Sequence, residues 1–285
     1  ENLGMQELIS KLHHFRISLK LAKKIYKYYG HSSVKMIEDN PYCLANNVRG
    51  ISFDKADEIA NELKIIGADP KRIKGAIEYV LYMIYEEDGS TYALKSYVIS
   101  KVRQLLFTQD QIDYSDEVII ANLKELVFKD VRDIPDFKTD IGQVRQVDNR
   151  IYLARYYGYE ENIASALIKL NANKIELDDF EELVDIYLRA SHDYQYKLSD
   201  EQERAVFNSL ENRVSIITGG PGTGKSTVIL MILMVYTQYK LYNFEDVLNR
   251  IILLAPTGRA AKRMYEITKV EAFTIHSFLE RRDEK

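Results

Sequence analysis

A glycine-rich turn between two apolar runs constrains the fold of this chain more than any other feature. Residues 219–226 read GGPGTGKS and match the pattern G-x-x-x-x-G-K-[ST] in full. The apolar run Val214–Thr218 precedes the turn and is predicted to be a buried strand. A second apolar run, Val228–Tyr236, follows it and is predicted to lie in a helix. Because a phosphate-binding loop requires a strand before it and a helix after it, we predict a P-loop α/β domain here.

The residues of this loop have the chemistry that phosphate binding needs. Glycines let the backbone wrap so that its N–H groups converge on phosphate oxygens, and the N-terminus of the next helix adds a partial positive charge. Lys225 can reach the β- and γ-phosphates, and the Ser226 hydroxyl can coordinate Mg²⁺. We therefore predict Lys225 and Ser226 as catalytic residues, with Ser226 as the magnesium ligand. The predicted nucleotide-binding residues of the loop are Gly220, Pro221, Gly222, Thr223, Gly224, Lys225, Ser226 and Thr227.

Composition sets limits on the kind of protein. A chain of 285 residues is long for one domain, so we expect two or more compact units. The net charge of −4 gives no global nucleic-acid signature, so any such site must be a local patch. Cys43 is the single cysteine, which excludes an internal disulfide and a cysteine-based zinc site and fits a reducing cytoplasm. No apolar run is long enough to span a bilayer and no secretory leader opens the chain, so we expect no membrane partner. The chain opens on Glu1, which suggests a piece of a longer protein.

Composition and residue pattern divide the chain into four segments. Residues 1–110 are helical in pattern, and residues 111–172 are predicted to form a small winged-helix-like α+β module. Residues 173–197 form a polar, acidic linker helix, and residues 198–285 form part of the P-loop α/β domain. Within the second segment, the predicted elements are a helix at Glu117–Phe128, β-runs at Gly142–Val147 and Arg150–Ala154 joined by an Asp148–Asn149 turn, and a helix at Glu160–Leu170.

The first segment contains an internal repeat. RISLKLAKKI at 16–25 parallels GISFDKADEI at 50–59, with an offset of 34 residues. The offset invites a tetratricopeptide interpretation, which we reject because only two copies occur and the signature Trp, Gly and Tyr positions are absent. A short turn that leads into a helix, twice over, is better interpreted as a pair of helical hairpins.

Two segments beside the loop leave alternatives open. Ser199 and Gln202 stand at capping-box spacing, so one interpretation is that Gln202 caps a helix and has no other role. After the predicted strand Ile251–Ala255, the sequence PTGRAAKR places hydroxyl and basic groups where α/β sheets bind ligands. These groups suit a nucleic-acid backbone, but a helix start with a solvated basic face fits equally well.

Several motifs occur together in a characteristic order. Gln202, the loop 219–227, APTGRAA at 255–261 and FTIHSFL at 273–279 resemble the Q-motif, motif I, motif Ia and the next motif of superfamily 1 DNA helicases. They resemble in particular the RecD/TraA family, which is related to the α subunit of exodeoxyribonuclease V. NPYCLANNVRGISFDKADEIANELKI at 40–65 and RISLKLAKKIYKYYG at 16–30 resemble the helix-hairpin-helix region before the motor of this family. YLARYYGYEENIASALIKL at 152–170 also resembles the segment before the motor, so the resemblance covers nearly the whole chain.

The resemblance implies a function and a set of contacts. It implies ATP-driven 5′→3′ translocation on single-stranded DNA with unwinding at single-strand/duplex junctions, a RecA-like motor domain in residues 198–285, ATP and Mg²⁺ as cofactors, and other repair proteins as possible partners. Carried over by position, Gln202 contacts the adenine. Thr257 and Arg259, with Thr274 and His276, fall where the family meets the DNA strand.

The sequence also departs from the family pattern. The candidates for the acidic Walker B pair are Glu280, Asp283 and Glu284, and none of them follows an apolar strand. The second motor domain, with its γ-phosphate-sensing arginine, is not found in these residues. Because hydrolysis depends on charge stabilisation by these parts, we expect a fragment that binds nucleotide weakly and hydrolyses it poorly.

Charge distinguishes the two predicted hairpins. Between Leu8 and Ile37 the sequence has no acidic residue, and this stretch suits phosphates. Its basic residues are Lys11, Arg16, Lys20, Lys23, Lys24, Lys27 and Lys35, of which we select Lys20, Lys23 and Lys24 as candidate DNA contacts. Around the second hairpin, Asp54, Asp57 and Glu58 are expected to repel phosphates. Both turns lack the usual pair of glycines, since the first has Arg16 and Ser18 and the second Gly50 and Ser52.

Two other functions remain open from the sequence. The chain can belong to a P-loop ATPase of another class, in which the helical part senses a protein or a nucleotide. It can also be a DNA- or protein-binding platform that nucleotide only gates. Stimulation of ATP hydrolysis by single-stranded DNA separates the helicase from the first alternative, and salt-dependent DNA binding by residues 1–170 favours the second.

Overall fold

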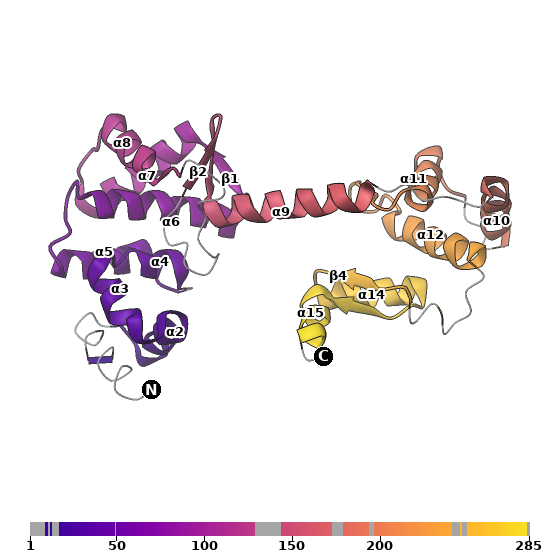
Figure 1. Cartoon of the computed structure of the whole chain (residues 1–285), viewed down its shortest axis with the longest axis horizontal. Helices are drawn as coiled ribbons and strands as arrows, with labels where there is room; N and C mark the ends of the chain where they lie inside the picture. The colour runs from indigo at the N-terminus through magenta and orange to yellow at the C-terminus, as the bar shows by residue number, and fades with distance from the viewer. Residues whose placement is uncertain are drawn as a thin grey trace. The chain divides into compact units, whose positions relative to one another are not determined.

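A computed structural model describes residues 9–10, 12, 17–48, 50–128, 144–172, 179–193, 197–240, 246 and 250–283. It divides the chain into two compact units, residues 1–163 and 164–285, and the boundary falls inside helix α9 (Ala154–Asn171) (Figure 1). The expectation of more than one compact unit is confirmed. In the described part of the chain, no helix combines the length and the apolar character needed to cross a membrane.

The first unit begins as an array of helices. In chain order they are α2 (Leu19–Tyr29), a 3-10 turn (Gly30–Ser32), α3 (Ser33–Asp39), α4 (Cys43–Asn47), α5 (Phe53–Glu62), α6 (Pro70–Asp88), α7 (Lys95–Asp110) and α8 (Asp116–Leu126). The sequence repeat corresponds to one local design used twice. Ser18 accepts a hydrogen bond from the Leu21 N–H and Ser52 from the Lys55 N–H, so each serine caps the helix that follows it.

A small antiparallel sheet completes this unit. Its strands β1 (Tyr92–Leu94), β3 (Arg150–Leu153) and β2 (Val144–Val147) lie in that order. The predicted hairpin with its Asp148–Asn149 turn is confirmed for the described residues, and Asp148 takes a positive φ of 53° in the turn. Strand β1 was not predicted, and α9 begins directly after β3 rather than at Glu160.

The helices and the sheet of the first unit share one core. Side chains from α5, α6, α7, α8 and all three strands form a continuous buried cluster, while α2, α3, α4 and part of α5 surround a second cluster that contains Cys43. Because β1 comes from before residue 110 and its partner β3 from after it, the sheet draws on both sides of that position. The winged-helix interpretation and the four segment boundaries therefore stay predictions.

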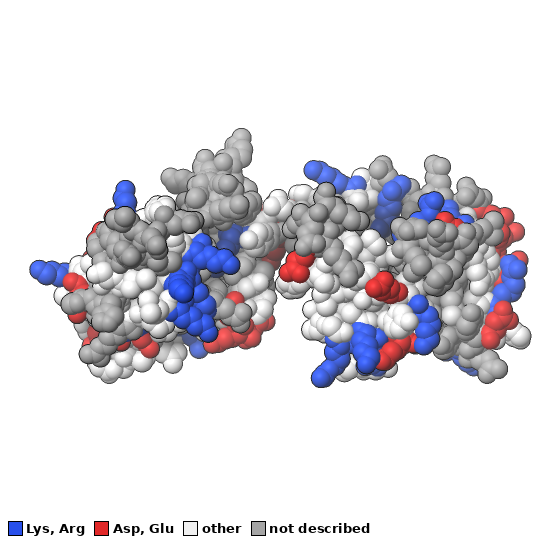
Figure 2. All heavy atoms as spheres, turned by 90° about the horizontal axis from the view of Figure 1, so that it is seen from below, with Lys and Arg blue, Asp and Glu red and all other residues white. Residues whose placement is uncertain are grey.

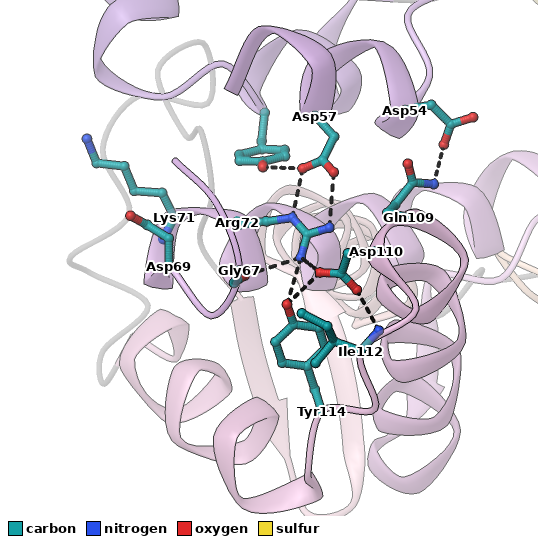
Figure 3. Close-up of polar contacts among 11 residues, drawn as sticks. Asp54, Asp57, Gly67, Asp69, Lys71, Arg72, Gln109, Asp110, Ile112 and Tyr114 are labelled. Atoms are coloured by element: carbon teal, nitrogen blue, oxygen red, sulfur yellow. Dashed lines mark hydrogen bonds and ion pairs between the residues drawn. The ribbon is translucent and has the colours of Figure 1, made fainter. Parts of the chain in front are cut away.

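A buried arginine holds the helices of this core together. Arg72 is 2% exposed, and its guanidinium binds Asp57 through two bonds, Nε to Oδ1 at 2.8 Å and Nη2 to Oδ2 at 3.0 Å (Figure 3). Its Nη1 donates to Asp110 Oδ2 at 2.8 Å, to the Tyr114 hydroxyl at 3.1 Å and to the Gly67 carbonyl at 3.2 Å. Arg72 on α6 thus joins α5, the end of α7 and two loops.

The charges of this cluster compensate one another. Burial works against the charged form of Arg72, but hydrogen bonding to Asp57 and the charges of Asp57 and Asp110 outweigh it and raise the pKa of the guanidinium. Asp57 also accepts a hydrogen bond from the Tyr42 hydroxyl at 2.5 Å. The expectation that Asp57 repels phosphates is therefore wrong, because its carboxylate is buried and paired. Asp54 and Glu58 are exposed, and they accept hydrogen bonds from Gln109 and Lys55 respectively.

The second unit is an α/β arrangement. Its elements are the last part of α9, α10 (Phe180–Asp193), α11 (Asp200–Glu211), α12 (Lys225–Tyr239), β4 (Leu253–Ala255), α14 (Gly258–Thr268), β5 (Ala272–Thr274) and α15 (Ile275–Asp283). Helices α10, α11 and α12 pack around a buried cluster that includes Leu183, Val206 and Met231. Strands β4 and β5 are parallel and pair Ala255 with Thr274. Of the predicted linker helix, the described part forms α10, whose apolar face belongs to this cluster.

One predicted strand is not formed. No described strand pairs with Val214–Thr218, and Ile216 is 78% exposed, so the run lacks both the ladder and the burial of an interior parallel strand. Strand β4 is paired with β5 and not with this run. The prediction is wrong because a strand needs a neighbour to hydrogen-bond, which an apolar sequence cannot guarantee.

Removal of the Arg72 charge tests the role of the buried cluster. We expect Arg72→Met to lower the free energy of unfolding of the first unit by about 3–5 kcal/mol, because Asp57 is left buried without its cation. Lys55→Met on α5 removes a cation from a more exposed pair and should cost less than about 1 kcal/mol. Urea unfolding followed by circular dichroism measures both, and equal losses would contradict this role.

A second buried carboxyl predicts a dependence on pH. Glu78 is 3% exposed and accepts from Asn46 Nδ2 at 2.7 Å, and burial raises its pKa from 4.5 to about 7 against the opposing effects of Asn46, Arg155 and Lys74. Because the folded state holds the proton more tightly than the unfolded chain does, stability from this group is full below pH 4.5 and is lost as the pH rises through about 7.

Glu78→Gln should remove this dependence, since its amide does not titrate. The difference in unfolding free energy between parent and variant should change by about 3 kcal/mol from pH 4.5 to pH 8, with the parent losing stability. Urea unfolding at a series of pH values measures the difference. A constant difference across the series would show that Glu78 keeps one protonation state.

Candidate nucleotide-binding site

The glycine-rich loop folds onto the N-terminus of α12. Gly224 precedes the helix with a φ of 76°, and its carbonyl accepts from the N–H groups of Thr227 and Val228 at 2.9 and 3.0 Å. Gly222 also has a positive φ, 78°. L-residues with a side chain rarely adopt these angles, so glycine is required at both positions. The N–H groups of Lys225 and Ser226 come before the first ones bound to the Gly224 carbonyl, so they lie at the end of the loop with no helix carbonyl to bind.

The loop is also closely packed at Gly219 and again at Gly224. A Cβ atom on Gly219 would lie 2.6 Å from Thr223 Oγ1, and one on Gly224 would lie 2.5 Å from Gln202 Nε2. The Thr223 hydroxyl donates to the Gly220 carbonyl at 2.9 Å and closes the turn. A backbone that bends this closely, rimmed by N–H groups, fits the phosphates of a nucleotide.

The Lys225 side chain lies along the loop. Its Nζ donates to the carbonyls of Gly219 and Gly220 at 2.7 and 2.6 Å. The ammonium group is therefore held at the mouth of the turn, where a negatively charged ligand would replace carbonyl oxygens as its partner. Ser226 is exposed in the first turn of α12. Among the described residues, no cluster of His, Cys, Asp and Glu could hold a metal ion by itself.

Gln202 serves two partners at once. Its Oε1 accepts from the Ser199 N–H at 2.9 Å, and Ser199 Oγ accepts from the Gln202 N–H at 3.4 Å, which completes the capping box of α11. Its Nε2 donates to the Thr223 carbonyl at 3.0 Å. The capping role is confirmed, and the same side chain also contacts the phosphate loop, which the capping interpretation alone does not require.

The predicted DNA-contacting residues of this unit gather at one edge of the parallel sheet. Thr257 follows β4 and Thr274 ends β5, and each caps the next helix by accepting a hydrogen bond, from Ala260 N at 3.3 Å and from Ser277 N at 3.1 Å. Arg259 on α14 and His276 on α15 are exposed. The structure thus brings the two helix starts together and gives both threonines a structural role, while contact with DNA stays a prediction.

The basic residues of the first hairpin occupy one side of α2. Lys20, Lys23 and Lys24 are all exposed, and Figure 2 shows basic side chains gathered in the region of this helix. Lys27 is exposed one turn further along and extends the same row at spacing i, i+3, i+4, i+7, a signal that the sequence already contained. Gly50, in the second hairpin turn, has a φ of 101°, and a Cβ there would lie 3.9 Å from Lys24 Nζ. Arg16 and Lys11 lie outside the described residues.

Two family models match separate parts of the chain. Residues 1–92 match the model described as the ATP-dependent RecD2 DNA helicase HHH domain. Residues 202–285 match the model described as an AAA domain, and this match begins at Gln202. The first match contains the basic row on α2 and the Ser18 and Ser52 helix starts, and the second contains the phosphate loop and the β4–β5 edge.

Curated relatives agree with these models. The ATP-dependent RecD2 DNA helicase of Deinococcus radiodurans is 25% identical over 281 residues, which are 96% of this chain and 36% of that protein. The RecBCD enzyme subunit RecD of Mycobacterium tuberculosis is 34% identical over 126 residues, 44% of this chain and 20% of that protein. The subunit of the same name from Haemophilus influenzae is 44% identical over 71 residues. The chain therefore spans about a third of the length of the RecD2 relative and a smaller share of the RecD subunits. Family models and relatives coincide in the segments that carry the motifs, and these segments are similar to the corresponding parts of RecD2 and RecD helicases.

Proposed function

We propose that this chain supplies the ATP phosphate grip and part of the DNA-binding surface of a helicase that moves 5′→3′ along single-stranded DNA. The observation that carries the proposal is the loop at the start of α12, with Lys225 Nζ at its mouth and Gln202 bound to its Thr223 carbonyl. ATP would be held through its phosphates by the loop N–H groups and Lys225, and Mg²⁺ by those phosphates and Ser226. The bound cation would withdraw charge from the γ-phosphate.

The protein residues then have distinct tasks. Lys225 exchanges two carbonyl partners for phosphate oxygens, so it gains charge-assisted bonds only when the nucleotide is present. Gln202 can follow the position of the loop because it is bonded to it, and its remaining capacity can be used for the adenine. The helix starts at Thr257 and Thr274, with Arg259 and His276 beside them, are proposed to meet the DNA backbone.

The proposal includes junctions between single and double strands as substrates and further repair proteins as partners. It is supported by the HHH match over residues 1–92 and by the exposed lysines of α2, which suit a DNA backbone. One experiment distinguishes a helicase from a P-loop ATPase of another class. The rate of ATP hydrolysis by the longest form of the protein that its gene encodes is measured with and without poly-deoxythymidine. Absence of stimulation would exclude the helicase.

Replacement of Lys225 tests the phosphate grip in this chain directly. We expect Lys225→Ala to weaken the binding of a fluorescent ATP analogue with Mg²⁺ by about tenfold or more, because a charge-assisted contact to phosphate is lost. Lys240→Ala is the control, because it removes a lysine from the other end of α12, where Lys240 Nζ lies 5.0 Å from the Tyr239 ring centroid. This variant should bind the ATP analogue as tightly as the parent does. Titration by fluorescence anisotropy gives both values, and equal affinities for parent and Lys225→Ala would refute the grip.

A pair of variants separates the two contacts of Gln202. Ser199→Ala removes one half of the capping box and should cost about 1 kcal/mol of unfolding free energy, with little effect on the ATP analogue. Gln202→Ala should cost a similar amount and also weaken nucleotide binding, since the bond to the Thr223 carbonyl is lost. Thermal unfolding and the anisotropy titration provide the two readouts. If both variants bind nucleotide equally well, Gln202 is a helix cap alone.

A further inference from the structure

The outer face of the three-stranded sheet carries an unusual set of side chains. In the register of the sheet, Tyr92 on β1, Tyr152 on β3 and Arg145 on β2 stand in one row, and Leu94, Arg150 and Val147 stand in the row two residues away. Side chains alternate along a strand, so these two rows share a face. The other face presents Ala93, Ile151 and Val144, which lie in the core of the first unit.

Tyrosine rings form a strip across this outer face, which we call the tyrosine strip (Tyr92, Tyr152 and Tyr157). The ring centroids of Tyr92 and Tyr152 are 5.3 Å apart, and those of Tyr152 and Tyr157, from the first turn of α9, are also 5.3 Å apart. An arginine stands at each end of the strip. Arg150 lies 5.6 Å from the Tyr92 centroid and Arg145 lies 5.5 Å from the Tyr157 centroid. Three neighbouring aromatic rings therefore lie between two positive charges along one surface.

One end of the strip is open to solvent. Tyr92 is 41% exposed and Leu94 is 51% exposed. The central Tyr152 is only 4% exposed and fixes the rings on either side. The Arg150 side chain is 44% exposed. An exposed aromatic ring and an exposed aliphatic side chain beside an accessible cation suit a ligand that carries both apolar faces and negative charge.

Two acidic side chains of the described residues lie near the edge of the strip. Asp148 Oδ2 lies 3.8 Å from Arg150 Nη2, and Glu160 accepts a hydrogen bond from Thr91. The Asp148 side chain is 88% exposed, so its attraction for Arg150 is screened by water. A phosphate group brought to this edge can therefore compete with Asp148 for the guanidinium, and bidentate pairing with phosphate favours it.

We propose that the tyrosine strip with Arg150 and Arg145 is a binding surface for single-stranded DNA. A base stacks on the exposed Tyr92 ring, and the adjoining phosphate pairs with Arg150. The surface is separate from the phosphate loop and from the lysine row of α2, so it adds a contact to the proposed helicase function rather than restating it. It rests on that function only in the identity of the nucleic acid.

The chemistry favours a single strand over a duplex. Bases inside a duplex are stacked on one another, so their faces cannot reach a tyrosine ring, whereas each unpaired base has a free π-face. Stacking on an aromatic ring tolerates any base and needs no hydrogen-bonding partners, and the strip offers rings and cations but no array of donors and acceptors aimed at base edges. We therefore expect little dependence on sequence.

The test compares fluorescein-labelled oligo-deoxythymidine with a strand of the same length made of abasic deoxyribose phosphates. Parent protein should bind the thymidine strand about fivefold or more tightly than the abasic strand, because only bases can stack. Tyr92→Ala should reduce this ratio and Tyr92→Phe should keep it, which separates loss of the ring from loss of the fold. Tyr97→Ala is the matched control, since Tyr97 is 46% exposed with Lys101 5.5 Å from its ring centroid and lines a cavity between α6 and α7.

The charge of the surface gives a second readout. Arg150→Gln should lower the slope of log affinity against log salt by about 0.7, the value for one phosphate contact on a single strand, and Asp148→Asn should strengthen binding. An oligonucleotide with 5-iodo-deoxyuridine should cross-link under ultraviolet light to the peptide that contains Tyr92. An unchanged thymidine-to-abasic ratio in Tyr92→Ala, or preferential binding of duplex, would overturn the proposal.

Failure of this surface and failure of the phosphate grip are distinguishable. Lys225→Ala should bind the thymidine strand without nucleotide as tightly as the parent does, because the two sites share no residue. One result would be that Lys225→Ala no longer binds the ATP analogue while Tyr92→Ala keeps the parental preference for the thymidine strand over the abasic strand. That result supports the nucleotide site and refutes DNA binding by the tyrosine strip. The reverse result removes the ATP function and leaves the strip as a DNA-binding surface.

Discussion

The buried Arg72 cluster is the interaction on which the architecture of the first unit depends. The guanidinium of Arg72 donates from all three of its nitrogen atoms, and its partners come from α5, the end of α7 and two loops. These partners are Asp57, Asp110, Tyr114 and the Gly67 carbonyl. An arginine that is only 2% exposed is tolerable because two carboxylates compensate its charge and each of its three nitrogen atoms has an acceptor. That requirement fixes the angle between the second hairpin and the helices after it. A hydrophobic cluster of the same volume would allow several packing arrangements of the helices. The guanidinium of Arg72 allows few, because its hydrogen bonds have fixed directions.

The position of the sheet follows from this arrangement. Because α6 and α7 are held by Arg72 and share a core with β1, β2 and β3, the sheet keeps one face against the helices and turns the other outward. The outward rows are not the polar residues that a solvated sheet face normally shows. They hold tyrosines, a leucine and arginines, and the buried Tyr152 positions its two neighbours. Rigid placement of the rings reduces the conformational entropy that stacking a base would otherwise cost.

The sequence predicted local features well and long-range pairings poorly. The turns that contain Ser18 and Ser52 and lead into helices, the capping box at Ser199, the Asp148–Asn149 turn and the phosphate loop were predicted. Each of these features is decided by a few neighbouring residues. Strand β1 is three residues long and its partner β3 lies almost sixty residues away, so no local periodicity marks it. The same reason explains the Val214–Thr218 error, since pairing decides a strand and composition does not. Asp57 was judged by its charge alone, and only the fold reveals that Arg72 takes it out of solvent.

The phosphate loop illustrates how one side chain can couple two levels of structure. Gln202 closes the capping box of α11 with its oxygen and holds the Thr223 carbonyl with its nitrogen, so the start of α11 and the turn of the loop move as one element. The amide accepts through its oxygen and donates through its nitrogen without carrying a charge, whereas an ionised glutamate could only accept. Lys225 is meanwhile satisfied by the carbonyls of Gly219 and Gly220, and those bonds are strong enough to hold the ammonium group in place yet are exchangeable for phosphate oxygens. A loop with these contacts is preorganised before the nucleotide binds. Its affinity for the nucleotide therefore depends in part on contacts that do not involve a phosphate, such as the bond from Gln202 to the Thr223 carbonyl.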